Sequence, residues 1–145
     1  DCQKTDWDCV RQGGTCVPLD PGLNSIMKPD QCRWVKSGPS ICRVNPKTNT
    51  ALLLLKTNAP DLFIINEAFP PTDPHDSAGH YNGCVVDIGV KKVNGTVSCE
   101  TVYQVMEAAN RSGFSIVNNE YKNCNGNPSE RSTGGHIHLG AANCP

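Results

Sequence analysis

Three of the four histidines in this chain lie in two short motifs that could bind a metal ion. The first motif runs from His80 to Asp87 with six residues between them, and the second is His136-Ile137-His138. Imidazole and carboxylate groups bind Zn²⁺ where cysteine does not. Three protein ligands and one open position make a zinc site catalytic rather than structural, so the motifs predict a hydrolase.

The second motif has the spacing of neighbours on one face of a β-strand. Residues two apart in a strand point the same way, so His136 and His138 would project together while Ile137 and Leu139 face the opposite side. If the strand that carries Asp87 pairs with this one, the carboxylate meets a histidine across the ladder.

The first motif needs a turn to complete the site. Gly83 would let the backbone turn and bring His80 back over Asp87. The residues alone therefore predict a mixed set of nitrogen and oxygen ligands: His80, Asp87 and one histidine of the later pair.

The segments that position these motifs alternate between helix and strand signals. The order predicts an α+β fold, a small antiparallel sheet with helices packed on one side. Helix caps and turn formers set most of the boundaries. The expected helices are a segment capped by Asn45 that ends near Lys56 and one capped by Ser98 that ends near Asn110, and the expected strands are 62–65, 84–90, 114–117 and 136–140.

Residues 1–43 differ from the rest of the chain because they hold five of its nine cysteines and few apolar residues. Such a segment cannot bury enough surface to fold alone, so we expect an irregular N-terminal arm pinned by disulfides. Residues 44–145 would form the catalytic domain. The cysteine content predicts an oxidising compartment and a secreted, extracellular protein, as does the abrupt start at Asp1, which is typical of a processed chain.

Charge and hydropathy exclude two classes of partner. The formal net charge is −1 and neither sign forms a long run, which argues against nucleic acid as a partner. No apolar stretch approaches the roughly 20 residues that a membrane span needs, so we expect no membrane partner. We also expect the protein to be a monomer. Asn94 and Asn110 begin glycosylation sequons that would be used in a eukaryotic source.

The motif residues His80, Gly83, Asp87 and His136-Ile137-His138 resemble those of the LAS-type zinc metallopeptidases (lysostaphin, D-Ala-D-Ala peptidase and hedgehog-like), most closely the D-alanyl-D-alanine carboxypeptidase (M15) branch. The resemblance implies that His80, Asp87 and His138 bind zinc and that His136 is the catalytic partner of a metal-activated water. It also implies a peptidoglycan-derived peptide as substrate, cut by a carboxypeptidase or an endopeptidase.

The chain departs from that family at several positions. Ala78 stands where members often have a serine, and the arginine that holds a substrate carboxylate is missing after the first strand. Dipeptidase-type members place a glutamate three residues before the last ligand, where this chain has Gly135. His136 is therefore the expected base, with Glu120 and Glu67 as reserve candidates.

Two other functions stay open at this point. The first is a non-catalytic zinc-bearing binding or signalling module, as hedgehog-like relatives are. The second is a wall-degrading glycosidase (a muramidase), which needs two carboxylates on either side of a groove. Glu67, Glu120 and Asp87 could supply that pair, although no spacing identifies it.

Overall fold

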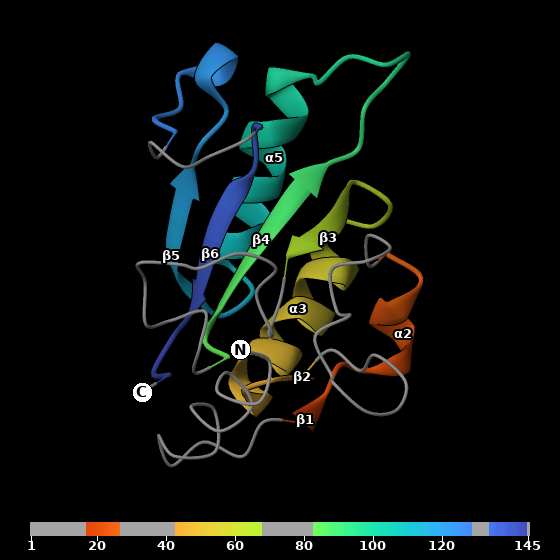
Figure 1. Cartoon of the computed structure of the whole chain (residues 1–145), viewed down its shortest axis with the longest axis vertical. Coiled ribbons are helices and arrows are strands. Elements are labelled where there is room, and N and C mark those ends of the chain that lie inside the picture. The colour runs from red at the N-terminus through yellow and green to blue at the C-terminus, as the bar shows by residue number, and fades with distance from the viewer. Residues whose placement is uncertain (1–16, 27–42, 68–82, 129–133, 145) are drawn as a thin grey trace.

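The computed structural model describes residues 17–26, 43–67, 83–128 and 134–144, whose main feature is an antiparallel sheet with helices on one face (Figure 1). The sheet contains four strands: β3 (Phe63–Glu67), β4 (Val85–Val90), β5 (Phe114–Asn119) and β6 (Ile137–Ala141). The two long helices are α3 (Pro46–Asn58) and α5 (Cys99–Asn110). This architecture confirms the α+β prediction.

Both long helices begin at the caps that the sequence predicts. The Asn45 side chain accepts a hydrogen bond from the Lys47 N–H at 3.0 Å, and Pro46 fills the first helical position. The Ser98 hydroxyl accepts from the Thr101 N–H at 3.4 Å. Each cap satisfies a backbone donor that the first turn leaves without a partner, which fixes where the helix starts.

The strands lie in the order β3-β4-β6-β5, and every neighbouring pair is antiparallel. The last strand in the sequence, β6, is therefore inserted between β4 and β5. This order places β4, β6 and β5 side by side, and the three strands carry or lead into the residues of the candidate site (Figure 1).

One face of the sheet packs on the helices and forms the apolar core. The largest side chains of this core are at most 2% exposed, and they alternate along β3, β4 and β6, as a sheet buried on its helical face requires. They include Phe63, Ile65, Val86, Ile88, Ile137 and Leu139 from the sheet and Leu52, Leu55, Val102 and Val105 from the helices. We call the opposite face, which carries Asp87, Asn118, His138 and Gly140, the site face.

Part of the N-terminal arm packs on this domain. The short strands β1 (Val17–Pro18) and β2 (Arg43–Val44) pair with each other, and α2 (Pro21–Asn24) follows β1. Leu19 and Leu23 join the domain's core. The five cysteines expected to pin the arm, Cys2, Cys9, Cys16, Cys32 and Cys42, lie outside the described residues.

Two disulfides tie the described domain. Cys84–Cys144 joins the residue before β4 to the segment after β6. Cys99–Cys124 joins the start of α5 to the single 3₁₀ turn η1 (Lys122–Cys124). These bonds are compatible with an extracellular location. Among the described residues, no helix has both the length and the apolar character that crossing a membrane requires.

Candidate metal centre

Strand β6 and the residue before it present His138 and His136 to the site face, as the spacing predicts. Ile137 and Leu139 are fully buried in the core, so the residues between and before them point the other way. His138 lies within β6 and His136 immediately precedes it. The side chains of these histidines are 21% and 17% exposed, so each retains limited access to solvent.

Asp87 lies directly across the ladder from His138. The two residues are register partners between β4 and β6, and His138 Nδ1 is 3.1 Å from Asp87 Oδ1. The same oxygen is 3.6 Å from His136 Nε2. A carboxylate that is only 9% exposed requires such polar partners, because burying an unpaired charge is costly. The strand pairing expected from the sequence is confirmed.

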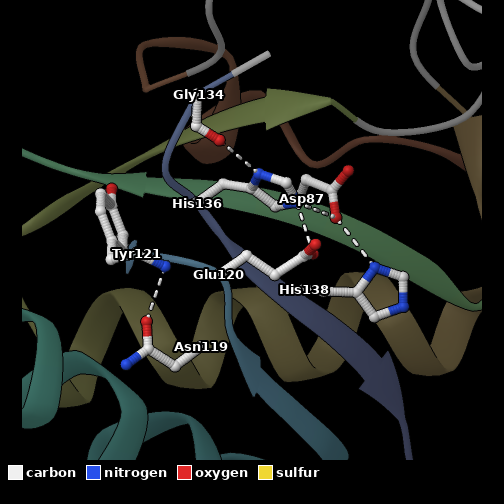
Figure 2. Close-up of polar contacts among 7 residues, drawn as sticks. All are labelled: Asp87, Asn119, Glu120, Tyr121, Gly134, His136 and His138. Atoms are coloured by element: carbon white, nitrogen blue, oxygen red, sulfur yellow. Dashed lines mark hydrogen bonds and ion pairs between the residues drawn. The ribbon is translucent and has the colours of Figure 1, made fainter. Parts of the chain in front are cut away.

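Glu120 reaches the site from the end of β5. Its backbone N–H donates to the His136 carbonyl oxygen at 2.9 Å, which continues the β5–β6 ladder past the last strand residue. Its carboxylate Oε2 lies 2.7 Å from His136 Nε2. Figure 2 shows one side of the His136 ring, its Nε2, facing the carboxylates of both Asp87 and Glu120, while His138 contacts the same Asp87 carboxylate.

The hydrogen bonds around His136 define its proton arrangement. His136 Nδ1 lies 3.2 Å from the Gly134 carbonyl oxygen, which can only accept, so Nδ1 carries a hydrogen. The ring therefore directs Nε2 toward Glu120. A contact of 2.7 Å between that nitrogen and a carboxylate oxygen needs a shared proton, because two bare acceptors would repel each other.

Asp87, Glu120 and His136 form a group that could hold a metal ion. One ligand atom from each residue lies within 4.8 Å of the others. Their side chains are 9%, 10% and 17% exposed, so the protein shields the group from most of the solvent. Two carboxylates and an imidazole, with the second imidazole of His138 close to Asp87, make a donor set that suits a divalent cation.

The other predicted site residues have varied positions. His80 lies outside the described residues, as does the side chain of Glu67, whose backbone pairs with Asp87. Gly83 has a φ of +79°, the left-handed conformation expected of a turning glycine. Asn94 and Asn110 are both exposed, and their glycosylation remains a prediction.

No pattern in the sequence indicated that Gly135 and Tyr121 pack against each other beside the site. A Cβ at Gly135 would lie 2.6 Å from Tyr121 Cε1 and closer still to Cδ1, so no larger residue fits there without moving the ring. Tyr121 is buried, and its hydroxyl accepts a hydrogen bond from the Val90 N–H at 2.8 Å. The carboxylate beside His136 therefore comes from Glu120 on a neighbouring strand, and Tyr121 is a packing residue.

The fixed position of Glu120 also depends on a local turn. The Asn119 side chain accepts from the Tyr121 N–H at 2.8 Å (Figure 2). It also donates to the Cys124 carbonyl at 2.8 Å. These bonds hold the backbone on both sides of Glu120. The pattern Ile116, Asn118, Glu120, with alternate residues on the site face, is the only sequence signal that could have indicated this placement.

Comparison of this chain with protein-family models gives no match, and a search of curated proteins finds none either.

Proposed function

We propose that this protein is a secreted zinc-dependent peptidase that hydrolyses amide bonds in bacterial peptidoglycan peptides. The observation that carries the proposal is the pair of histidine–carboxylate contacts on adjacent strands. Asp87 Oδ1 lies 3.1 Å from His138 Nδ1, and Glu120 Oε2 lies 2.7 Å from His136 Nε2. The different distances suit different roles for the two pairs.

The Asp87–His138 pair suits shared coordination of an ion. Two ligand atoms on one tetrahedral zinc, each about 2.0–2.1 Å from it, lie about 3.3 Å apart. The 3.1 Å between His138 Nδ1 and Asp87 Oδ1 is close to that separation. With His80 as third ligand, which the family resemblance implies, one coordination position stays open for substrate or water.

The Glu120–His136 pair suits proton transfer. At 2.7 Å the two atoms share a hydrogen bond, and the Gly134 carbonyl holds the far side of the imidazole ring. Glu120 thus orients the His136 ring through a hydrogen bond to Nε2 itself. His136 and Glu120 therefore act together as the general base, and the Glu120 carboxylate takes up the proton while His136 holds that carboxylate in position.

These roles give a complete hydrolysis. Zinc, when bound, would polarise the scissile carbonyl and lower the pKa of water toward about 7. The Glu120 carboxylate accepts the water's proton as the water oxygen bonds to the carbonyl carbon, because His136 Nε2 already shares a proton with Glu120. The carboxylate then returns the proton to the amine nitrogen as the carbon–nitrogen bond breaks, and His136 keeps the carboxylate in place through both transfers.

The muramidase alternative fits this geometry less well. A retaining glycosidase needs two carboxyl groups about 5–5.5 Å apart with the glycosidic bond between them. Here both carboxylates face the same atom, His136 Nε2, at 3.6 Å and 2.7 Å from their oxygens, so the imidazole engages the two groups that a glycosidase would direct at the glycosidic bond.

Replacing the two histidines one at a time tests the proposal. We expect His138→Ala and Asp87→Ala to lose both stoichiometric zinc and hydrolysis, because each removes a ligand. We expect His136→Ala to retain zinc but lose activity by a factor of about 10²–10⁴, the usual contribution of a general base. Elemental analysis measures the zinc, and release of free amines from peptidoglycan, with and without a chelator, measures the activity.

The possible results distinguish the metal mechanism, a different set of metal ligands and the muramidase alternative. Full activity in Asp87→Ala would refute the metal mechanism. Loss of zinc from His136→Ala, with zinc retained by His138→Ala, would instead assign the ion to the group of Asp87, Glu120 and His136. Chelator-insensitive release of reducing sugar would favour the muramidase.

A further inference from the structure

The exposed side chain of Ile116 lies against β6, the strand that carries His138 and follows His136. Ile116 on β5 is the register partner of Gly140 on β6, two residues beyond His138. A Cβ built on Gly140 would lie 2.9 Å from Ile116 Cδ1 and 3.0 Å from its Cβ, so the isoleucine occupies the space above this glycine. Because residues 138 and 140 share a face, Ile116 lies on the site face.

The placement of Ile116 depends on an irregularity in β5. The register of the β5–β6 ladder shifts between Phe114 and Ile116. Without this extra residue, positions 114 and 116 would point the same way, yet Phe114 is buried in the core while Ile116 is 44% exposed. The bulge therefore directs an apolar side chain out of the core and toward the site.

The two ends of the site face differ in chemistry. His136 and Gly140 lie on opposite sides of His138 along β6, each about 6.8 Å away by the rise of an antiparallel strand. The His136 end is polar, with the carboxylates of Glu120 and Asp87 beside the ring. At the Gly140 end, Val85 is the partner across the ladder but is buried, so Ile116 supplies the exposed apolar surface.

This asymmetry orients a substrate, given the proposed function on which the inference rests. The His136–Glu120 pair returns a proton to the leaving amine, so the amine side of the scissile bond must lie at the His136 end. The acyl side then extends past His138 toward Gly140. A side chain on the residue that contributes the scissile carbonyl would meet Ile116.

We infer that Ile116, seated over Gly140, is a specificity-determining residue that selects an apolar side chain on the acyl side of the scissile bond. Glycine at position 140 is part of this subsite, because any side chain there would displace the isoleucine. Asn118, exposed on the same face between Ile116 and Glu120, separates the apolar subsite from the proton-transfer pair.

Binding of acyl-product analogues tests the subsite without depending on turnover. We would titrate zinc-loaded protein with N-acetyl-alanyl-leucine and N-acetyl-alanyl-serine by calorimetry, using both enantiomers of the last residue. We expect wild type to bind the better leucine enantiomer about tenfold more tightly than its serine counterpart, a typical discrimination by an apolar pocket. Ile116→Ser should reduce this ratio to about twofold or less, and Ile116→Val should give an intermediate ratio.

Leu54→Ser is the matched control, because Leu54 lies on α3 in the helical layer and is exposed to 47%, close to the 44% of Ile116. It should leave the leucine-to-serine ratio unchanged, and thermal melts should show that all variants fold. An unchanged ratio in Ile116→Ser, or no preference in wild type, would overturn the inference. Absence of peptide hydrolysis in wild type would refute the proposed function instead, while the binding ratio still decides the subsite.

Discussion

Gly135→Ala is expected to destabilise the protein by forcing a methyl group into the ring of Tyr121. The added Cβ would lie 2.6 Å from Cε1 and 3.1 Å from Cγ, well inside van der Waals contact. The ring has little room to retreat, because Tyr121 is 8% exposed and its hydroxyl is bonded to the Val90 N–H at 2.8 Å. The strain must therefore be taken up by the ring, the hydrogen bond or the backbone before His136.

The size of the effect follows from the cost of overpacking. Forcing an extra methyl group into a well-packed position costs about 1–3 kcal/mol of unfolding free energy. For a chain of this size, a loss of about 2 kcal/mol lowers the Tm by about 4–8 °C. Hydrolysis should slow as well, because Glu120 and His136, the proposed proton-transfer pair, are the immediate neighbours of Tyr121 and Gly135.

The adjacent glycine gives a control with the same chemistry. A Cβ at Gly134 would have nothing within 4 Å, and no left-handed φ marks this position, so alanine fits without strain. Gly134→Ala should be neutral or stabilise by up to about 1 kcal/mol, because it reduces the entropy of the unfolded chain. Thermal melts and urea titrations followed by circular dichroism measure both variants. Equal stability of Gly135→Ala and wild type, or an equal loss in Gly134→Ala, would refute the steric argument.

Two further perturbations test the surroundings of the site. Burial raises the pKa of the Tyr121 phenol above its ordinary 10.0, although the hydrogen bond from a β4 backbone N–H partly lowers it. The unfolded chain loses this proton first, so the stability that Tyr121 contributes is present below about pH 10 and falls above it. Urea midpoints across that range should fall more steeply for wild type than for Tyr121→Phe, and parallel curves would contradict this. Replacing Cys84 and Cys144 with serine should cost about 4 kcal/mol, and replacing Cys99 and Cys124 about 3.5 kcal/mol, because the bonds close loops with sequence separations of 60 and 25 residues. Unchanged urea midpoints in either double variant would show that its loop is restrained by other contacts.

The elements of the fold were predictable because their signals are local. Asn45-Pro46 and Ser98 place polar caps directly before helical segments, and the observed helices begin there. The alternation His136, Ile137, His138, Leu139 required one polar and one buried face of a strand, and the structure has both. Each of these features depends only on residues close in the sequence.

Which residues form the site was harder to predict, because it depends on the order of the strands in the sheet. Glu120 meets His136 only because β6 is inserted between β4 and β5, which no local pattern specifies. The bulge after Phe114 decides which face Ile116 occupies, and a strict alternation of two would place both residues on one face. The requirement for glycine at position 135 comes from Tyr121, a residue distant in sequence.

Alternate residues of the segment from His136 to Gly140 have two different roles, in the site and in the core. Its even positions belong to the site face and its odd positions, Ile137 and Leu139, to the core. Point substitutions can therefore change the chemistry while the core is kept, or the reverse. A single-residue insertion or deletion in this segment would shift the strand register by one residue. Histidine side chains would then face the core, and aliphatic side chains would face the site. Sequence drift in this strand should thus proceed by replacement, with length changes confined to the loops at its two ends.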